Sequence, residues 1–207
     1  MADYTLPPRA TLIAGMTGSG KTTFVNRLLL NSNPACRFIF DDLNRMTGRL
    51  RLQPLYLERE LEAALSSRWI AFHPVRMFPG DTKNAFRWFC HWVFSVAARR
   101  PGEKMVCVPE VWRHCTADSI PVEFAILIQA GRELNIHVIV DTQRPELVNP
   151  SITGAATELV CFKLISPESL CLVEKLGMNR ATVGALPLGS FVGRNQLSGG
   201  TLAGRLF

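Results

Sequence analysis

The sequence predicts an α/β fold in which a mainly parallel sheet is covered by helices on both faces. Three observations predict this fold. Short apolar runs alternate along the chain with longer stretches whose apolar residues recur at helical spacing. The short runs contain few polar residues, as strands do when both of their faces are buried. A glycine-rich loop, residues 15–22, separates the first apolar run from the first helical stretch.

The glycine-rich loop reads Gly-Met-Thr-Gly-Ser-Gly-Lys-Thr and fits the phosphate-loop pattern G-x-x-x-x-G-K-[ST] at every fixed position. Residues 11–14 before it are expected to form a strand, and residues 23–30 after it a helix. Glycines allow the backbone to turn its N–H groups toward phosphate oxygens at a helix N-terminus, where the dipole favours an anion. Strand, loop and helix in this order predict a nucleoside triphosphate site.

The last two residues of this loop have expected roles. Lys21 is expected to reach the β- and γ-phosphates, and the Thr22 hydroxyl to hold Mg²⁺. The ligands that the sequence predicts are therefore ATP and Mg²⁺. The other residues expected to contact the nucleotide are Gly15, Met16, Thr17, Gly18, Ser19, Gly20 and Thr23.

The composition sets limits on the architecture. A chain of 207 residues, 47% hydrophobic and 19% charged, can bury one α/β core and has little room for a second domain. We expect one domain, with a leader at residues 1–9, a core at 10–185 and a β extension at 186–207. The net charge of +6 favours an anionic partner such as nucleic acid. Six cysteines without a C-x-x-C pair favour reduced thiols inside a cell, and no apolar run is long enough to span a bilayer.

The remaining elements follow from the same patterns. Apolar runs predict strands at residues 36–40, 69–73, 105–108, 136–140 and 159–165. Helices are expected at about 58–67, 84–100 and 119–134, and from Ser166 onward. Residues 43–57 have no clear period and are expected to form a basic loop or a short irregular segment. The glycine-rich tail is expected to close as a β-hairpin, with its last strand at 202–207.

A phosphate-loop protein also needs an acidic residue at the end of a neighbouring strand. After residues 105–108 one expects Asp-Glu, but the sequence has Pro109-Glu110. We hypothesise that Glu110 activates the attacking water and completes the metal site, while Thr22, phosphates and waters supply most of the metal contacts. Two alternatives stay open: Glu110 is a solvated loop carboxylate, or the metal-side acid is one of Asp41, Asp42 and Asp141.

Four segments carry a resemblance to a known family. They are the loop at 15–22, the strand ending in Glu110, the run Gly-Arg-Glu-Leu-Asn-Ile at 131–136 and the run Asp-Thr-Gln-Arg-Pro at 141–145. Together they resemble the FtsK–HerA superfamily of DNA-pumping ATPases, whose fold is a RecA-like P-loop NTPase. In its compact form the chain is similar to the genome-packaging ATPases of tailless, internal-membrane viruses and phages. The resemblance extends from Leu12 to about Val192, and its most discriminating part is Thr-Gln-Arg-Pro.

The resemblance implies further site residues. It implies that Gln143 senses the γ-phosphate and that Arg132 reaches into the site of a neighbouring subunit, so that the working form is a ring, a hexamer by analogy. A Gln beside the phosphate-loop strand can orient water, and an arginine supplied in trans stabilises transition-state charge. An exposed Arg132 without such a role stays open, and Arg144 and Arg180 are other candidates.

The leading function implied is ATP-driven translocation of double-stranded DNA into a preformed viral capsid. The implied partners are DNA and capsid or membrane-vertex proteins, in the cytoplasm of an infected host cell or at a packaging vertex of the virion. Without a zinc-finger spacing or other DNA-reading module, candidates for gripping DNA phosphates are Arg76, Lys83 and the arginines between Arg45 and Arg51. The alternatives are a membrane-linked phage assembly or secretion ATPase, which would carry a transmembrane segment, and a slow nucleotide switch, which Pro109 would suit.

Overall fold

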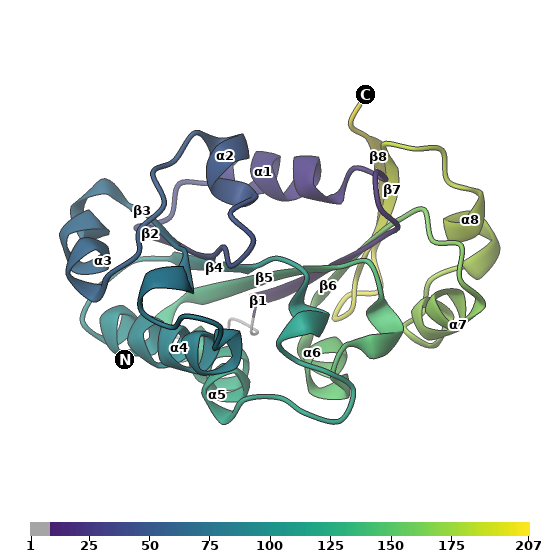
Figure 1. Ribbon diagram of the computed structural model, residues 1–207. Coiled ribbons are helices and arrows are strands. Elements are labelled where there is room, and N and C mark those ends of the chain that lie inside the picture. Colours follow the sequence, from purple (N-terminus) through teal and green to yellow (C-terminus); the bar gives the residue numbers. More distant parts are fainter. Residues whose placement is uncertain (1–8) are drawn as a thin grey trace.

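The computed structural model describes residues 9–207, so the predicted leader lies outside the described residues except for Arg9. The chain forms an 8-stranded sheet with the order β3-β2-β4-β5-β1-β6-β7-β8 (Figure 1). The strands are β1 (Arg9–Ala14), β2 (Cys36–Phe40), β3 (Trp69–Phe72), β4 (Lys104–Val108), β5 (Ile136–Thr142), β6 (Glu158–Phe162), β7 (Ser190–Asn195) and β8 (Thr201–Arg205). Neighbouring strands from β3 to β6 pair in parallel, and β7 and β8 pair antiparallel. The predicted fold class and the C-terminal hairpin are confirmed.

Helices cover both faces of the sheet, as predicted. In Figure 1, α1 and α2 lie over one face, and α4, α5 and α6 lie over the other. The helices are α1 (Lys21–Asn31), α2 (Met46–Leu50), α3 (Glu58–Ala64), α4 (Thr82–Ala98), α5 (Val122–Ala130), α6 (Pro150–Ala155), α7 (Pro167–Lys175) and α8 (Arg180–Ala185). Two buried clusters result, one with Ile13, Val25 and Ile139 on the α1 side and one with Phe38 and Phe89 on the α4 side. No helix in residues 9–207 is long and apolar enough to cross a membrane.

Three helical features differ from the sequence prediction. Residues 43–57 contain the short helix α2, which the carboxylate of Asp41 supports by accepting backbone N–H bonds from Arg45 and Thr47. The short helices α6 and α8 were not predicted. Each follows an asparagine cap, Asn149 or Asn179, and has only 6 residues, too few for a clear apolar period.

The predicted strand at 159–165 ends earlier, at Phe162. Its last apolar residue, Ile165, is 65% exposed, and α7 begins two residues later with Pro167 at its first position. The carbonyl of Lys163, just past the strand, accepts the backbone N–H of Met16 at 2.8 Å. The chain leaves the sheet here because this segment turns to support the glycine-rich loop.

The C-terminal hairpin also supports the loop. The N–H of Gly189 donates to the carbonyl of Ser19 at 3.0 Å. The ring of Phe191 in β7 packs edge-on against Phe24 in α1, with 4.9 Å between ring centroids, and tilted against Phe162 in β6. The hairpin thus fixes the start of α1 against β6.

The strand order determines which loops meet. β1 pairs with β5 and β6, and β5 pairs with β4. Because parallel strands end at the same edge of a sheet, the segments that follow β1, β4 and β5 come together there. These segments carry the glycine-rich loop, Pro109-Glu110 and Gln143.

Candidate nucleotide-binding site

The glycine-rich loop has the backbone shape that its glycines predict. Gly20 has φ 115°, a left-handed value that side chains disfavour, and α1 begins at the next residue, Lys21. A Cβ added to Gly15 would lie 2.6 Å from Cβ of Phe162 in β6. The loop therefore needs glycine at Gly20 for conformation and at Gly15 for close packing on β6.

Lys21 is buried at the inner wall of this loop. Its residue surface is 5% exposed, and its Nζ donates to the carbonyls of Gly15 at 2.7 Å and Met16 at 3.1 Å. Burial lowers the pKa of Lys21, while the charges of Asp141 and Glu110 raise it. The ammonium is thus oriented within the loop by carbonyls, which a phosphate oxygen can replace.

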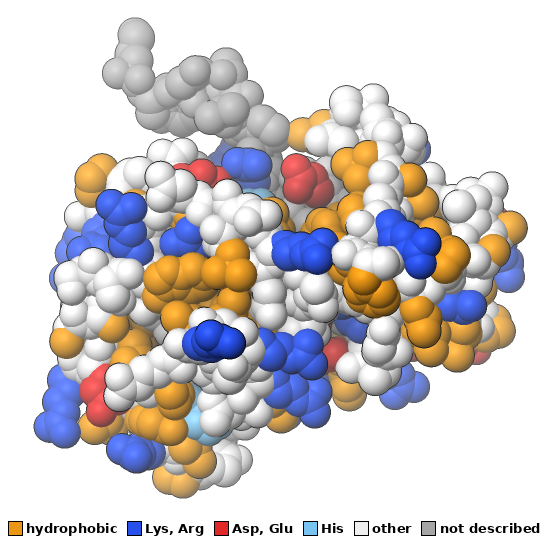
Figure 2. All heavy atoms as spheres, turned by 90° about the horizontal axis from the view of Figure 1, so that it is seen from above, with side chains coloured by type: hydrophobic (Ala, Val, Ile, Leu, Met, Phe, Trp, Pro, Cys, Tyr) orange, Lys and Arg blue, Asp and Glu red, His pale blue; other side chains and the backbone are white. Residues whose placement is uncertain are grey.

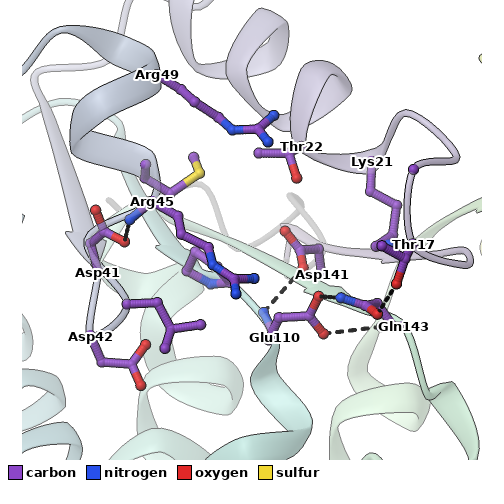
Figure 3. Close-up of a pocket in the computed structure, with 14 residues that line it drawn as sticks. Thr17, Lys21, Thr22, Asp41, Asp42, Arg45, Arg49, Glu110, Asp141 and Gln143 are labelled. Carbon is purple, nitrogen blue, oxygen red and sulfur yellow. Dashed lines mark hydrogen bonds between the residues drawn. The ribbon is translucent and has the colours of Figure 1, made fainter.

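Glu110 and Gln143 form one hydrogen-bonded unit. Gln143 Nε2 donates to Glu110 Oε1, and the Gln143 backbone N–H donates to Glu110 Oε2 at 3.2 Å. Trp112 Nε1 donates to the same Oε2 at 2.9 Å. Thr17 Oγ1 in the glycine-rich loop donates to Gln143 Oε1, so the loop, Gln143 and Glu110 are linked side chain to side chain (Figure 3). The structure therefore brings together these sequence-predicted residues.

Two of the alternative acids are already engaged. Asp41 is buried and accepts backbone N–H bonds from Arg45 and Thr47, both at 2.8 Å, and the Thr47 hydroxyl at 2.9 Å. Asp42 pairs with Arg113 through an Nη1–Oδ2 contact of 2.7 Å. Burial raises the pKa of Asp42, and Arg113 opposes this shift. Both carboxylates hold the segment after β2 in shape.

Asp141, the third alternative, is bonded differently. It lies in β5, is 4% exposed, and its Oδ1 accepts the backbone N–H of Glu110 at 3.1 Å. Within residues 9–207 its carboxylate has no other hydrogen bond. Burial raises the pKa of Asp141 to about 6; the N–H of Glu110 and the charge of Lys21 oppose the shift, and the charge of Glu110 adds to it.

The acidic groups of the site do not form a closed metal centre. Across the described chain, no three His, Cys, Asp or Glu side chains converge to hold a metal ion. Mg²⁺ usually takes one or two protein carboxylates and completes its shell with phosphate oxygens and water. Thr22, Glu110 and Asp141 line one pocket, so the donor set fits a cation shared with bound phosphates.

Two arginines that the sequence suggested for DNA lie in this pocket instead. Arg45, the N-cap of α2, and Arg49, within α2, line the same pocket as Lys21 and Thr22 (Figure 3). The sequence did not predict this location, because residues 43–57 have no clear helical period and the position of α2 over the sheet could not be inferred. Arg51 does not line the pocket. The sequence analysis therefore missed these two residues as candidate nucleotide contacts.

The other basic candidates lie outside the pocket. Arg76 stacks over the ring of Tyr56, with 4.2 Å from Cζ to the ring centroid, and Lys83 is exposed. Arg144 is 3.6 Å from Glu146, and Arg180 is 3.6 Å from Glu174.

Arg132 is also outside the pocket, and on the opposite edge of the sheet. It is exposed in a 3-10 turn, Gly131–Leu134, that directly precedes β5. The carboxyl end of β5, which leads to Gln143, is the end that faces the pocket. Any contact of Arg132 with a nucleotide would therefore involve another subunit.

The phosphate loop after β1, the acidic residue after β4 and the mainly parallel sheet are features of the P-loop NTPase fold. Solved structures with this fold include B204, the genome packaging NTPase of Sulfolobus turreted icosahedral virus 2. Its sulfate complex matches with a TM-score of 0.79 at 14% identity, over 98% of each chain. Its AMP complex matches with a TM-score of 0.74 at 15% identity, over 98% of this chain and 100% of B204.

A second group of similar structures consists of larger proteins. EssC of Geobacillus thermodenitrificans, in a structure of its ATPases 2 and 3, matches with a TM-score of 0.58 at 13% identity, over 95% of this chain and 39% of that one. No known family profile matches the sequence, and no curated protein matches it. At these identities the likeness establishes the fold, and the P-loop fold that the resemblance implied is confirmed.

Proposed function

We propose that this protein hydrolyses ATP with Mg²⁺ and uses the energy to move double-stranded DNA into a preformed viral capsid. The observation that carries the proposal is the linked set Thr17, Gln143 and Glu110 beside Lys21. It occurs in a fold that matches B204, a DNA-packaging ATPase, over nearly the full length of both chains. The chemistry and the size of the chain thus both suit a compact packaging ATPase.

The side chains have separate roles in this proposal. Lys21 exchanges its bonds to the loop carbonyls for bonds to the β- and γ-phosphates, and Thr22 contributes its hydroxyl to the metal shell. Bound Mg²⁺ neutralises phosphate charge. Glu110, held by Gln143 and Trp112, takes a proton from the attacking water.

Gln143 connects the reaction to the rest of the molecule. It bonds to Thr17 in the phosphate loop and to Glu110 after β4, so loss of the γ-phosphate changes the surroundings of both partners. In many nucleotide-dependent proteins, segments that contact the γ-phosphate are ordered before hydrolysis and released after it, and this change drives a larger conformational change. Movement of Gln143 is therefore the proposed first step in transmitting hydrolysis to DNA.

The proposed DNA contacts are electrostatic. Figure 2 shows Lys and Arg side chains spread over the face that carries α1, α2 and the hairpin, with few acidic side chains among them. Two further exposed side chains, Arg76 in the turn before α4 and Lys83 in the first turn of α4, are the proposed contacts with DNA phosphates, without base recognition. The proposed assembly is a homo-oligomeric ring, a hexamer, in which Arg132 reaches a neighbouring site. Its proposed location is the host cytoplasm or a packaging vertex, with capsid or membrane-vertex proteins as docking partners.

The test is steady-state ATP hydrolysis with and without double-stranded DNA over a salt series. We expect DNA to stimulate hydrolysis and the stimulation to fade as salt rises, because phosphate contacts release counterions. The variant Lys21→Ala is the control for activity from contaminants. Tight ATP binding without DNA stimulation at any salt concentration would contradict the proposal.

That contrary result would favour a second candidate, a slow nucleotide switch. The observation behind it is Pro109, which lacks the carboxylate expected at the end of β4. A switch would hydrolyse ATP at a low rate that DNA does not change, and it would differ in structure between the ATP- and ADP-bound states.

A further inference from the structure

Pro109 removes a carboxylate from the end of β4. A proline side chain has no charge and no hydrogen-bonding group. The next residue, Glu110, already accepts two bonds from Gln143 and one from Trp112. The end of β4 therefore offers a single carboxylate, and three donors orient it.

Asp141 lies at the matching point of the adjacent strand. The last pair between β4 and β5 is Val108 with Val140, and one residue further along Pro109 comes level with Asp141. Adjacent strands are about 4.8 Å apart, and side chains at the same level of parallel strands share a face. That face is the α1 side, because Ile139, two residues before Asp141, packs with Val25 of α1. Asp141 is also one strand nearer to the phosphate loop, since β5 pairs directly with β1.

The bonding of Asp141 leaves it available for a ligand. Asp41 and Asp42 are engaged by α2 and Arg113, whereas Asp141 accepts one bond, from the N–H of Glu110 to Oδ1. Figure 3 shows its other oxygen turned toward Thr22. Oxygen donors at Thr22 and Asp141 thus face the same space, as a phosphate-bound Mg²⁺ requires.

We infer that Asp141 binds the divalent cation of the nucleotide in place of the acid that Pro109 cannot supply. Glu110 is thereby free to act on water, which separates the two acidic roles onto two strands. The inference rests on the proposed function, because the cation concerned is the one that accompanies ATP.

The experiment measures how much Mg²⁺ tightens binding of AMPPCP to the full chain, by titration in excess Mg²⁺ and again in EDTA. For Asp141→Asn we expect unchanged affinity in EDTA and a gain from Mg²⁺ that is smaller by about tenfold. Asp42→Asn, which changes a paired carboxylate in the same pocket, should keep the full gain. Electron paramagnetic resonance of Mn²⁺ with AMPPCP should show reduced metal binding in Asp141→Asn alone.

A double variant separates metal binding from a structural role. Pro109→Asp combined with Asp141→Ala moves the carboxylate back to β4 and should recover the gain from Mg²⁺, which a merely structural role would not produce. A full gain from Mg²⁺ in Asp141→Asn would overturn the inference and leave the proposed function intact. Unchanged AMPPCP affinity in Lys21→Ala would instead overturn the nucleotide-binding function itself.

Discussion

Charged side chains are buried at both the amino and the carboxyl ends of the parallel strands, but their hydrogen bonding differs between the two ends. At the amino ends of the strands, Arg37 in β2 donates to the carbonyls of Leu29 and Ser32. Lys104 in β4 donates to the carbonyl of Leu134 at 2.7 Å. Each of these buried cations therefore bonds to backbone carbonyls within the same chain, an arrangement that stabilises the fold.

At the carboxyl ends, the buried Lys21 and Asp141 and the half-buried Glu110 face a pocket. Lys21, Glu110 and Asp141 line the same space, and Asp141 accepts a single hydrogen bond. Their charges also perturb one another, since Asp141 and Glu110 both act on the pKa of Lys21. Burial of a charge is thus common to both ends, whereas unused bonding capacity beside a pocket distinguishes the carboxyl end. That difference is what identifies a site for a charged ligand.

The largest expected effect on nucleotide binding comes from a pair of lysines, one at each end of the strands. Lys21→Ala should weaken ATP binding by about a hundredfold or more, because it removes charge-assisted bonds to phosphate. Lys104→Met, at the opposite end, should lower the free energy of unfolding by about 1–3 kcal/mol and leave ATP affinity unchanged. Calorimetric titration and urea unfolding of both variants check the pair. Equal ATP affinity in wild type and Lys21→Ala would remove the distinction between the two ends.

In the proposed ring, Arg132 at the amino end of the strands of one subunit would contact the pocket at the carboxyl ends of the strands of the next subunit. It is exposed at the amino edge, and a trans role would bring it to the carboxyl edge of a neighbour. Arg132→Ala should then lower hydrolysis by a factor on the order of a thousand. Mixed with wild type, the variant should reduce activity out of proportion to its fraction. A loss that is linear in the variant fraction would indicate subunits that act independently.

Glu110→Gln tests chemistry at the carboxyl end without removing the side chain. ATP affinity should stay within about threefold of wild type, while turnover falls by about a hundredfold or more through loss of the general base. Single-turnover hydrolysis together with binding titrations separates the two effects. Retained turnover would assign the base to another acid of the pocket. Asp141 would be the first candidate, because it accepts fewer hydrogen bonds than Asp41.

The sequence predicted the strands and the phosphate loop well because their signals are local. An apolar run interrupted by Arg37 predicted β2 with its observed bounds. The helix expected at residues 23–30 lies within α1, which begins slightly earlier, at Lys21. The short helices α6 and α8 were missed, since 6 residues that begin at an asparagine cap contain less than two helical turns.

For the site, the sequence predicted which segments meet but not which acids are free. Asp41 and Asp141 look alike in sequence, each ending or following a strand. Only the three-dimensional arrangement shows that Asp41 accepts bonds from Arg45 and Thr47, while Asp141 is left with one donor. The bonding state of a carboxylate depends on contacts between distant segments, which local patterns do not encode.

Arg45 and Arg49 test whether cations at the carboxyl end of the strands contribute to ATP binding. Both line the pocket, so the double variant Arg45→Ala/Arg49→Ala should weaken ATP binding by about tenfold through lost attraction to phosphate. Arg51→Ala, on the same segment but outside the pocket lining, is the matched control and should bind ATP as wild type does. Equal effects of the two variants would assign these arginines a general electrostatic role.

The smallest expected effect concerns His137 at the amino end. Its Nε2 donates to Thr11 Oγ1, whose hydroxyl donates to Glu158, and its Nδ1 is buried without a partner among residues 9–207. Burial lowers the pKa of His137 to about 4, helped by Arg9 and opposed by Glu158. The unfolded chain, with a histidine pKa of about 6.5, therefore binds more protons between these two values, and the free energy of unfolding falls as the pH drops.

The expected contribution of His137 to this loss is about 1 kcal/mol between pH 7 and 5.5. His137→Gln keeps a donor for Thr11 but does not titrate, so its stability should fall less over the same range. The comparison with wild type is essential because Asp141, whose pKa is raised to about 6, contributes in the opposite direction in both proteins. Urea unfolding at each pH measures the difference, and identical pH profiles would show that His137 is protonated to the same extent in the folded and unfolded chain. A smaller acid loss in His137→Gln would instead confirm that the fold keeps the buried His137 neutral at the amino end of the strands.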